Sequence, residues 1–145
     1  MKTEFDEEIE VELQEQLDRS EVKVLAGDQF LRVIESAFPM GLNRIAWDKI
    51  PAKHHIRLVE YSKAPVESFL ESIRGEYPEL DSYTVWVIGD DAIEQTYEMP
   101  FSLFCDRFDL FLSLPQHSYV IFGESADFCL NYTFEDDLYF GRRPS

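Results

Sequence analysis

Basic residues are scarce in this chain of 145 residues, which holds 13 lysines and arginines against 29 aspartates and glutamates. The resulting formal net charge of −16 disfavours direct binding to nucleic acid or to an anionic membrane, because either partner needs a basic patch. We therefore expect neither of those partners. A basic protein is the partner that this charge favours.

Long hydrophobic runs are also missing. The apolar stretches at 85–88 and 110–112 fall far short of the roughly 18 residues that suggest a membrane span. The start of the chain, Met1 to Glu8, is acidic, whereas a signal peptide begins with basic residues followed by an apolar centre. We expect a soluble, cytoplasmic protein.

Cysteine is limited to Cys105 and Cys129. Both lie in segments dense with phenylalanine and leucine, where a free cysteine packs as a small hydrophobe. In a cytoplasmic chain this context favours reduced, structural thiols over a disulfide. The sequence leaves open whether the two sulfurs lie close together.

Aromatic residues are plentiful, with 12 phenylalanines, 7 tyrosines and 2 tryptophans. So much apolar surface is not typical of a disordered chain. A chain of this length buries roughly two-thirds of its unfolded surface, which is enough for a core without a metal or disulfide. We expect one domain over residues 1–145, with a loose tail at 142–145, as a monomer or weak homodimer.

The first segment has two possible structures. Residues 5–17 carry an apolar residue at every fourth position after a capping Thr3, as in a helix. Residues 8–13 also alternate between glutamate and apolar residues, as in a strand. The abundance of Glu, Gln and Leu favours the helix.

Three further helices are predicted from apolar spacing and local start signals. They cover residues 28–38 from a cap at Asp28, residues 65–73 from Pro65, and residues 101–112.

Short runs rich in β-branched and aromatic residues predict the strands. The predicted strands are 55–61, 83–88, 93–97, 119–122, 128–134 and 138–140. A Gly-Asp-Asp turn at 89–91 joins two of them into a hairpin, and the last three form a meander. The expected fold is α+β: a mainly antiparallel sheet in two hairpin or meander units, packed by three to four helices.

No catalytic or metal-binding signature is present. His54 and His55 are adjacent, so in a strand their side chains would point to opposite faces and could not share a metal. The chain has no glycine-rich phosphate loop, and residues 123–126 do not match the Gly-x-Ser-x-Gly elbow. We expect no cofactor, metal or catalytic residue; the alternative is a small hydrolase-like enzyme using His54 or His55 with a carboxylate.

Charge is divided unevenly along the chain. Residues 1–21 carry a net charge of −7, residues 22–63 carry +3, and residues 64–145 carry −12. Either these blocks pair with one another in the fold, or the C-terminal acids form a face for a cationic partner.

Two acidic turns are the candidate partner-binding residues, with an aromatic residue as a possible apolar anchor. The candidates are Asp90, Asp91, Glu94, Glu135, Asp136 and Asp137, with Trp47 or Tyr97 as the anchor. The competing interpretation is that these acids serve the hydrogen bonds of their own turns.

Residues 119–128, Tyr-Val-Ile-Phe-Gly-Glu-Ser-Ala-Asp-Phe, and the return strand 129–134 resemble the strand-Gly-strand meander of the SUKH superfamily of bacterial toxin-immunity proteins. The resemblance implies a small cytoplasmic bacterial protein that binds and neutralises one toxin. A basic toxin such as a nuclease fits the charge, because an acidic protein can occupy its phosphate-binding groove. The alternative is a regulatory or adaptor interaction domain.

Chelation of metal ions is expected to leave the melting temperature unchanged, because the sequence holds no metal-ligand spacing and enough apolar residues for a core. A thermal melt followed by circular dichroism, with and without EDTA, measures this. A large drop in melting temperature, or stoichiometric zinc in the purified protein, would contradict it.

Overall fold

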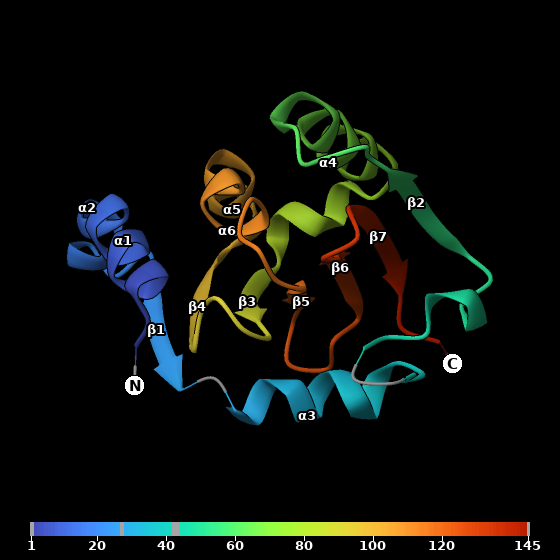
Figure 1. Ribbon diagram of the computed structural model, residues 1–145, viewed down its shortest axis with the longest axis horizontal. Helices are drawn as coiled ribbons and strands as arrows, with labels where there is room; N and C mark the ends of the chain where they lie inside the picture. Colours follow the sequence, from blue (N-terminus) through green and yellow to red (C-terminus); the bar gives the residue numbers. More distant parts are fainter. Residues whose placement is uncertain (1, 27, 42–43, 145) are drawn as a thin grey trace.

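One antiparallel sheet contains every strand in the part of the chain that the computed structural model describes, residues 2–26, 28–41 and 44–144 (Figure 1). Of residues 28–31 only the backbone is described. The order across the sheet is β1-β4-β3-β5-β6-β7-β2. The strands are β1 (Lys23–Ala26), β2 (Lys53–Arg57), β3 (Thr84–Gly89), β4 (Gln95–Pro100), β5 (Ser118–Phe122), β6 (Phe128–Tyr132) and β7 (Asp137–Arg142).

Helices cover both faces of this sheet. Figure 1 shows α3 along one face, with α4, α5 and α6 on the other and α1 and α2 beside the β1 edge. The helices are α1 (Glu4–Glu12), α2 (Gln14–Asp18), α3 (Asp28–Ala37), α4 (Lys63–Glu76), α5 (Phe101–Arg107) and α6 (Asp109–Leu112), with short 3₁₀ helices η1 (Trp47–Lys49) and η2 (Pro78–Ser82). The predicted α+β class with a mainly antiparallel sheet is confirmed.

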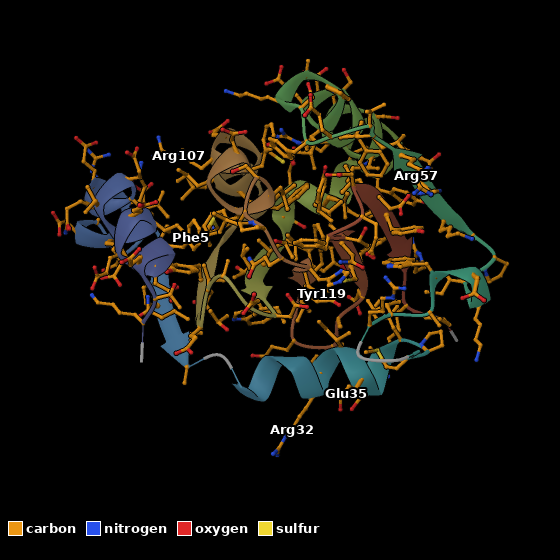
Figure 2. All side chains as sticks on the ribbon, viewed as in Figure 1. Phe5, Arg32, Glu35, Arg57, Arg107 and Tyr119 are labelled. Atoms are coloured by element: carbon orange, nitrogen blue, oxygen red, sulfur yellow. The ribbon has the colours of Figure 1, made fainter. Side chains whose placement is uncertain are left out.

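The alternation of side chains along each strand produces two cores. In β3, Val85 and Val87 belong to the larger core with α4 to α6, whereas Trp86 and Ile88 belong to the smaller core on the α3 side. Tyr119 of β5 lies in the smaller core, while Arg32 and Glu35 of α3 point away from the sheet (Figure 2). Burial on both faces explains why β5 and β6 are buried along their whole length.

A fully buried carboxylate, that of Asp6, links α1 to the start of β4. It accepts hydrogen bonds from the backbone N–H of Glu94 at 2.9 Å and of Gln95 at 3.4 Å, and from the Tyr97 hydroxyl at 2.6 Å. It also completes a capping box with Thr3 at the start of the helix. Burial raises the pKa of Asp6, but the hydrogen bonds from Glu94, Thr3 and Tyr97 outweigh it and leave the pKa below its ordinary value of 3.8.

The helical interpretation of the first segment is confirmed, and Thr3 is its cap. The helix breaks at Leu13, and the predicted helix 101–112 likewise breaks at Phe108, so each prediction corresponds to two helices. The cap proposed at Asp28 lies outside the described side chains.

Several strand boundaries were predicted wrongly, as was the helix start at Pro65, because α4 begins at Lys63. The strand predicted at 55–61 is instead β2, which begins at Lys53 and ends at Arg57. It ends there because its partner strand β7 begins at Asp137, the residue paired with Arg57. The second strand of the hairpin begins at Gln95 instead of Ile93, since the N–H of Ile93 donates to Gln116 and that of Glu94 donates to Asp6. No strand was predicted at β1, which is four residues long and pairs only along the β4 edge.

The loose tail predicted at 142–145 is wrong for its first two residues. Arg142 ends β7, and the backbone N–H of Arg143 donates to the Asp127 carbonyl at 2.8 Å. The Arg143 guanidinium also donates to the Ser125 carbonyl at 2.9 Å. Ser145 lies outside the described residues.

In the described part of the chain the longest helix is α4, which has 14 residues and one apolar face. No helix in that part is long and apolar enough to cross a bilayer.

Replacing the buried carboxylate with an amide, Asp6→Asn, is expected to lower the free energy of unfolding at pH 7 by about 1.5–3 kcal/mol, because an NH₂ group would face donors that now bond to an oxygen. The folded-state pKa lies below the unfolded value of 3.8, so this contribution is complete at higher pH and is lost as the pH falls through the folded pKa. Urea unfolding should therefore show a difference in the free energy of unfolding between the wild type and Asp6→Asn, and this difference should become smaller below about pH 3.8. The exposed change Glu7→Gln on the same helix is the control, and an equal effect of both changes would contradict the role of Asp6.

Candidate functional site

The two predicted acidic turns lie at the same end of the sheet. Gly89 pairs with Ser118, Ser118 with Tyr132, and Tyr132 with Leu138. The β3–β4 turn and the β6–β7 turn therefore leave the same end of the sheet, on either side of the start of β5. We call residues 90–94 and 134–137 together the acidic rim.

His117 connects the two turns of the acidic rim. Its backbone N–H donates to a carboxylate oxygen of Asp90 at 2.9 Å, and its carbonyl accepts from the Asp90 N–H at 3.2 Å. Its ring nitrogen Nδ1 accepts from the backbone N–H of Phe134 at 3.3 Å. His117 is half-buried and bridges the rim.

A buried amide, Gln116, holds the first turn from inside. Its Oε1 accepts from the backbone N–H groups of Ile93 at 3.2 Å and Asp91 at 3.4 Å, and its Nε2 donates to the Ser118 hydroxyl at 3.2 Å. Gly89 makes room for it, because a Cβ at that position would overlap the Gln116 amide. Sequence reasoning missed this residue, since a lone glutamine after a proline gives no signal of burial.

The acids of the first turn face solvent. Asp90, Asp91 and Glu94 are all exposed, and one oxygen of Asp90 receives the His117 bond while Asp91 bonds through its backbone only. These three side chains give the acidic rim negative charge that a partner can reach.

The acids of the second turn are engaged within the fold. Glu135 pairs with Arg44 at 2.5 Å, and the Tyr132 hydroxyl donates to Asp136 at 2.8 Å. Nε2 of His55 lies 2.8 Å from an oxygen of Asp137, whose side chain is 13% exposed. For Asp136 and Asp137, these bonds favour the interpretation that turn acids serve the hydrogen bonds of the fold over the interpretation that they are available to a partner.

Ion pairs and histidine–carboxylate contacts between the weakly basic middle block and the acidic C-terminal block account for part of the uneven charge. These pairs are Lys23–Glu98 at 3.9 Å, Arg44–Glu135, His54–Glu76 at 2.6 Å and His55–Asp137. The blocks pair with each other and still leave acids of the C-terminal block exposed, so pairing within the fold explains only part of the charge pattern.

Neither aromatic anchor predicted from the sequence is at the surface. Trp47 is 4% exposed; its ring stacks on Tyr139 with 5.1 Å between centroids, and its Nε1–H donates to Asn131 Oδ1 at 2.8 Å. Tyr97 is 0% exposed and donates to Asp6. Trp47 is therefore not an exposed anchor, because its loop folds over the smaller core instead of pointing into solvent.

The exposed aromatic of the acidic rim is Phe134, with 63% of its surface accessible. The sequence placed it at the end of a strand, but β6 ends at Tyr132 and the N–H of Thr133 donates to the Asp137 carbonyl, which starts the turn. The signal that could have found it is its position immediately before three consecutive acids, a composition typical of a turn.

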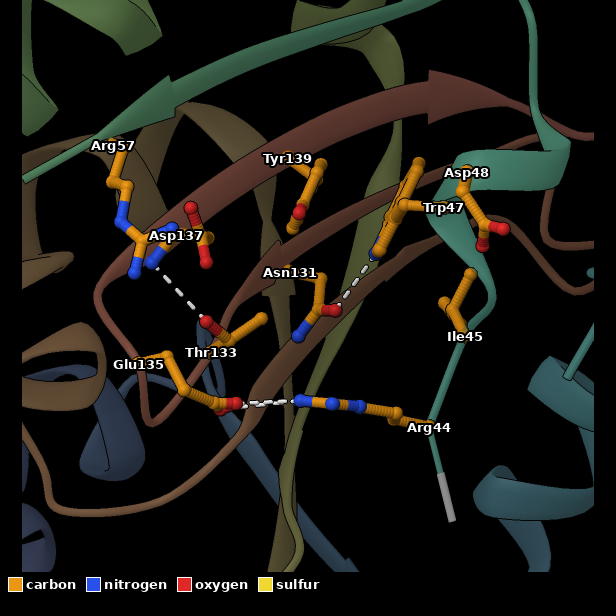
Figure 3. A pocket seen from close by; sticks show the side chains of 10 residues that line it. All are labelled: Arg44, Ile45, Trp47, Asp48, Arg57, Asn131, Thr133, Glu135, Asp137 and Tyr139. Atoms are coloured by element: carbon orange, nitrogen blue, oxygen red, sulfur yellow. Dashed lines mark hydrogen bonds and ion pairs between the residues drawn. The ribbon is translucent and has the colours of Figure 1, made fainter. Parts of the chain in front are cut away.

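A hollow of about 310 Å³ lies beside the rim on the α3 side of the sheet (Figure 3). Asn131 and Thr133 line it, and Arg44 reaches along one side to Glu135. The lining residues are Arg44, Ile45, Trp47, Asp48, Arg57, Asn131, Thr133, Glu135, Asp137 and Tyr139. Two arginines oppose three acids, so the charge in the hollow is nearly balanced.

The adjacent histidines point to opposite faces of the sheet, as predicted. His54 pairs with Glu76 of α4, and His55 pairs with Asp137 and stacks on Tyr139 at 4.3 Å. Among the described residues, neither ring has a hydroxyl or thiol within hydrogen-bond distance, and no three side chains gather as metal ligands. The two pairs fasten the edge strand β2 to α4 and β7.

Both cysteines are free, with Cys129 buried and Cys105 half-buried. Burial raises the pKa of the Cys105 thiol to about 12 and also raises the pKa of Cys129. Neither thiol is therefore an activated nucleophile at neutral pH.

Comparisons with known protein families, with curated proteins and with solved structures found no match for this chain.

Replacing the buried indole, Trp47→Phe, is expected to lower the free energy of unfolding by about 1–3 kcal/mol, because the buried Asn131 Oδ1 loses its donor. Phe134→Ala is the matched change of an exposed aromatic, and it should alter the same quantity by only about 0.5 kcal/mol. Urea unfolding followed by far-ultraviolet circular dichroism gives both values. The reverse order of effects would show that the exposures of these two rings have been assigned wrongly.

Proposed function

We propose that this protein is a non-enzymatic acidic binding protein that neutralises a basic toxin, such as a nuclease, by covering its active site. The observation that carries the proposal is the acidic rim, where His117 joins two acidic turns that lie far apart in the sequence. A surface held in this way needs little reorganisation when a partner docks.

Charge complementarity supports a basic partner. A nuclease must be cationic where it holds the phosphate backbone of its substrate, so an acidic surface can be steered to that groove and exclude the substrate. Asp90, Asp91 and Glu94 supply reachable negative charge at the rim, and the chain as a whole carries −16.

The toxin class of the partner comes from the resemblance of residues 119–134 to the SUKH immunity proteins. In this proposal the protein acts in the bacterial cytoplasm as a monomer or weak homodimer. A regulatory or adaptor domain with another basic partner would use the same rim, and the identity of the captured partner separates these two functions.

A small enzyme is the second alternative, and the pairing of each strand histidine with a carboxylate favours it. However, His54 and His55 lie on opposite faces, and the described residues place no nucleophile beside either ring. An enzyme would therefore have to use a single histidine–carboxylate pair, either His54 with Glu76 or His55 with Asp137.

The charge reversal Asp90→Lys/Asp91→Lys is expected to slow association with the partner by roughly tenfold or more at low salt, because exposed charges act through steering. The partner is captured by pull-down from the source cell, and association is followed by stopped flow at two salt concentrations. The single change Asp91→Lys should also slow association, by a smaller factor. It keeps the hydrogen bond between Asp90 and His117, so it separates the loss of charge from the loss of that bond.

The matched control is Glu7→Lys/Glu8→Lys, which makes the same charge change with exposed residues of α1. Equal slowing by both double variants would mean that total charge, not the acidic rim, steers association. An acidic partner would contradict the proposal outright.

A further inference from the structure

Phe134 is an apolar side chain that the fold leaves in water. Only Val11, Val59 and Phe134 are exposed large hydrophobic residues among those that the structure describes, and Phe134 is the aromatic one. A single exposed apolar residue is ordinary on a protein surface. The backbone that carries Phe134 is what sets it apart.

Hydrogen bonds fix the backbone on both sides of this ring. The Thr133 N–H donates to the Asp137 carbonyl at 2.8 Å, the Asp136 N–H donates to the Thr133 carbonyl at 3.1 Å, and the Asp137 N–H donates to Thr133 Oγ1 at 3.1 Å. Asp136 adopts a left-handed conformation with φ of 67°, and its carboxylate accepts from the Tyr132 hydroxyl. The turn therefore has one defined shape.

Neighbouring segments brace the same turn from three directions. The Phe134 N–H donates to the ring of His117, Arg44 holds Glu135, and His55 holds Asp137. Because these bonds come from three other segments of the chain, the turn is held in place relative to the sheet. The Phe134 ring, in contrast, is 63% exposed.

Val59 lies in a segment attached to this turn. The Leu58 N–H donates to the Asp136 carbonyl at 2.9 Å, and the next side chain, that of Val59, is fully exposed. The segment thus adds a second apolar side chain next to the acidic rim.

We propose that Phe134 is the apolar anchor with which the protein holds its partner, aided by Val59 on the segment bonded to the same turn, and that the partner presents an apolar pocket ringed by lysine and arginine side chains. This inference rests on the proposed function, because it assigns a role within the same acidic rim. A rigidly held phenylalanine with two side-chain torsions loses little conformational entropy on binding, which is the property of interface hot spots. The exposed acids of the rim complement the basic ring of the partner.

The first step of the test identifies what touches this ring. Phe134→p-benzoylphenylalanine, a photo-cross-linking residue, is introduced into the full chain in the source cell, with Val11→p-benzoylphenylalanine as the matched exposed position on α1. The protein cross-linked at position 134 and not at position 11 is identified, purified and used as the partner. Cross-linking at position 11 without cross-linking at position 134 overturns the inference.

The decisive measurement is the dissociation rate of the purified pair. Phe134→Ala is expected to raise this rate at least tenfold and to leave the salt dependence of association unchanged, while Val11→Ala changes the rate less than twofold. Val59→Ala should give a smaller increase than Phe134→Ala. The circular dichroism spectrum and melting temperature of each variant show that its fold is intact.

The outcomes separate this inference from the proposed function. A basic partner whose association depends on salt, but whose dissociation rate is the same for Phe134→Ala and Val11→Ala, overturns the anchor alone. An acidic partner that is released faster by Phe134→Ala overturns the proposed function and the basic ring, while Phe134 stands as an anchor.

Discussion

Burial of both faces of a single antiparallel sheet is the constraint on which the rest of this structure depends. Helix α3 and the loop that carries Trp47 cover one face, and the remaining helices cover the other. Strands β5 and β6 have no solvent-facing side and are apolar almost throughout. The surfaces left for recognition are the ends of the strands and the outer faces of the helices, and the two acidic turns meet at one such end.

Much of the fold could be predicted because local signals and tertiary structure agree. Val85 to Ile88, the Gly-Asp-Asp turn after them and the aromatic meander of residues 119–140 each have a pattern that fits one element. The helical spacing in residues 5–17 prevailed over their alternation because Ile9 and Leu13 both fall on the face that packs against the sheet. The antiparallel class followed from the hairpin and the meander, which pairing between β3 and β5 joins into one sheet.

The rest depended on contacts between residues distant in sequence. Nothing near Trp47 shows that Asn131, 84 residues later, accepts a hydrogen bond from its indole. Phe134 looked like part of a strand because the turn that exposes it is defined by Asp137 and by His117. Composition could predict two acidic turns, but it could not separate Asp91, which faces solvent, from Asp137, which holds His55. Burial and exposure of individual aromatic rings are properties of the whole fold and not of their neighbours in sequence.

The bridge made by His117 also selects one form of its imidazole ring. Because Nδ1 accepts a hydrogen bond from the Phe134 N–H, a neutral ring must carry its hydrogen on Nε2. An imidazolium has a hydrogen on both nitrogens and therefore no acceptor to offer. The hydrogen bond that joins the two turns at this end of the sheet therefore depends on one tautomer of one side chain.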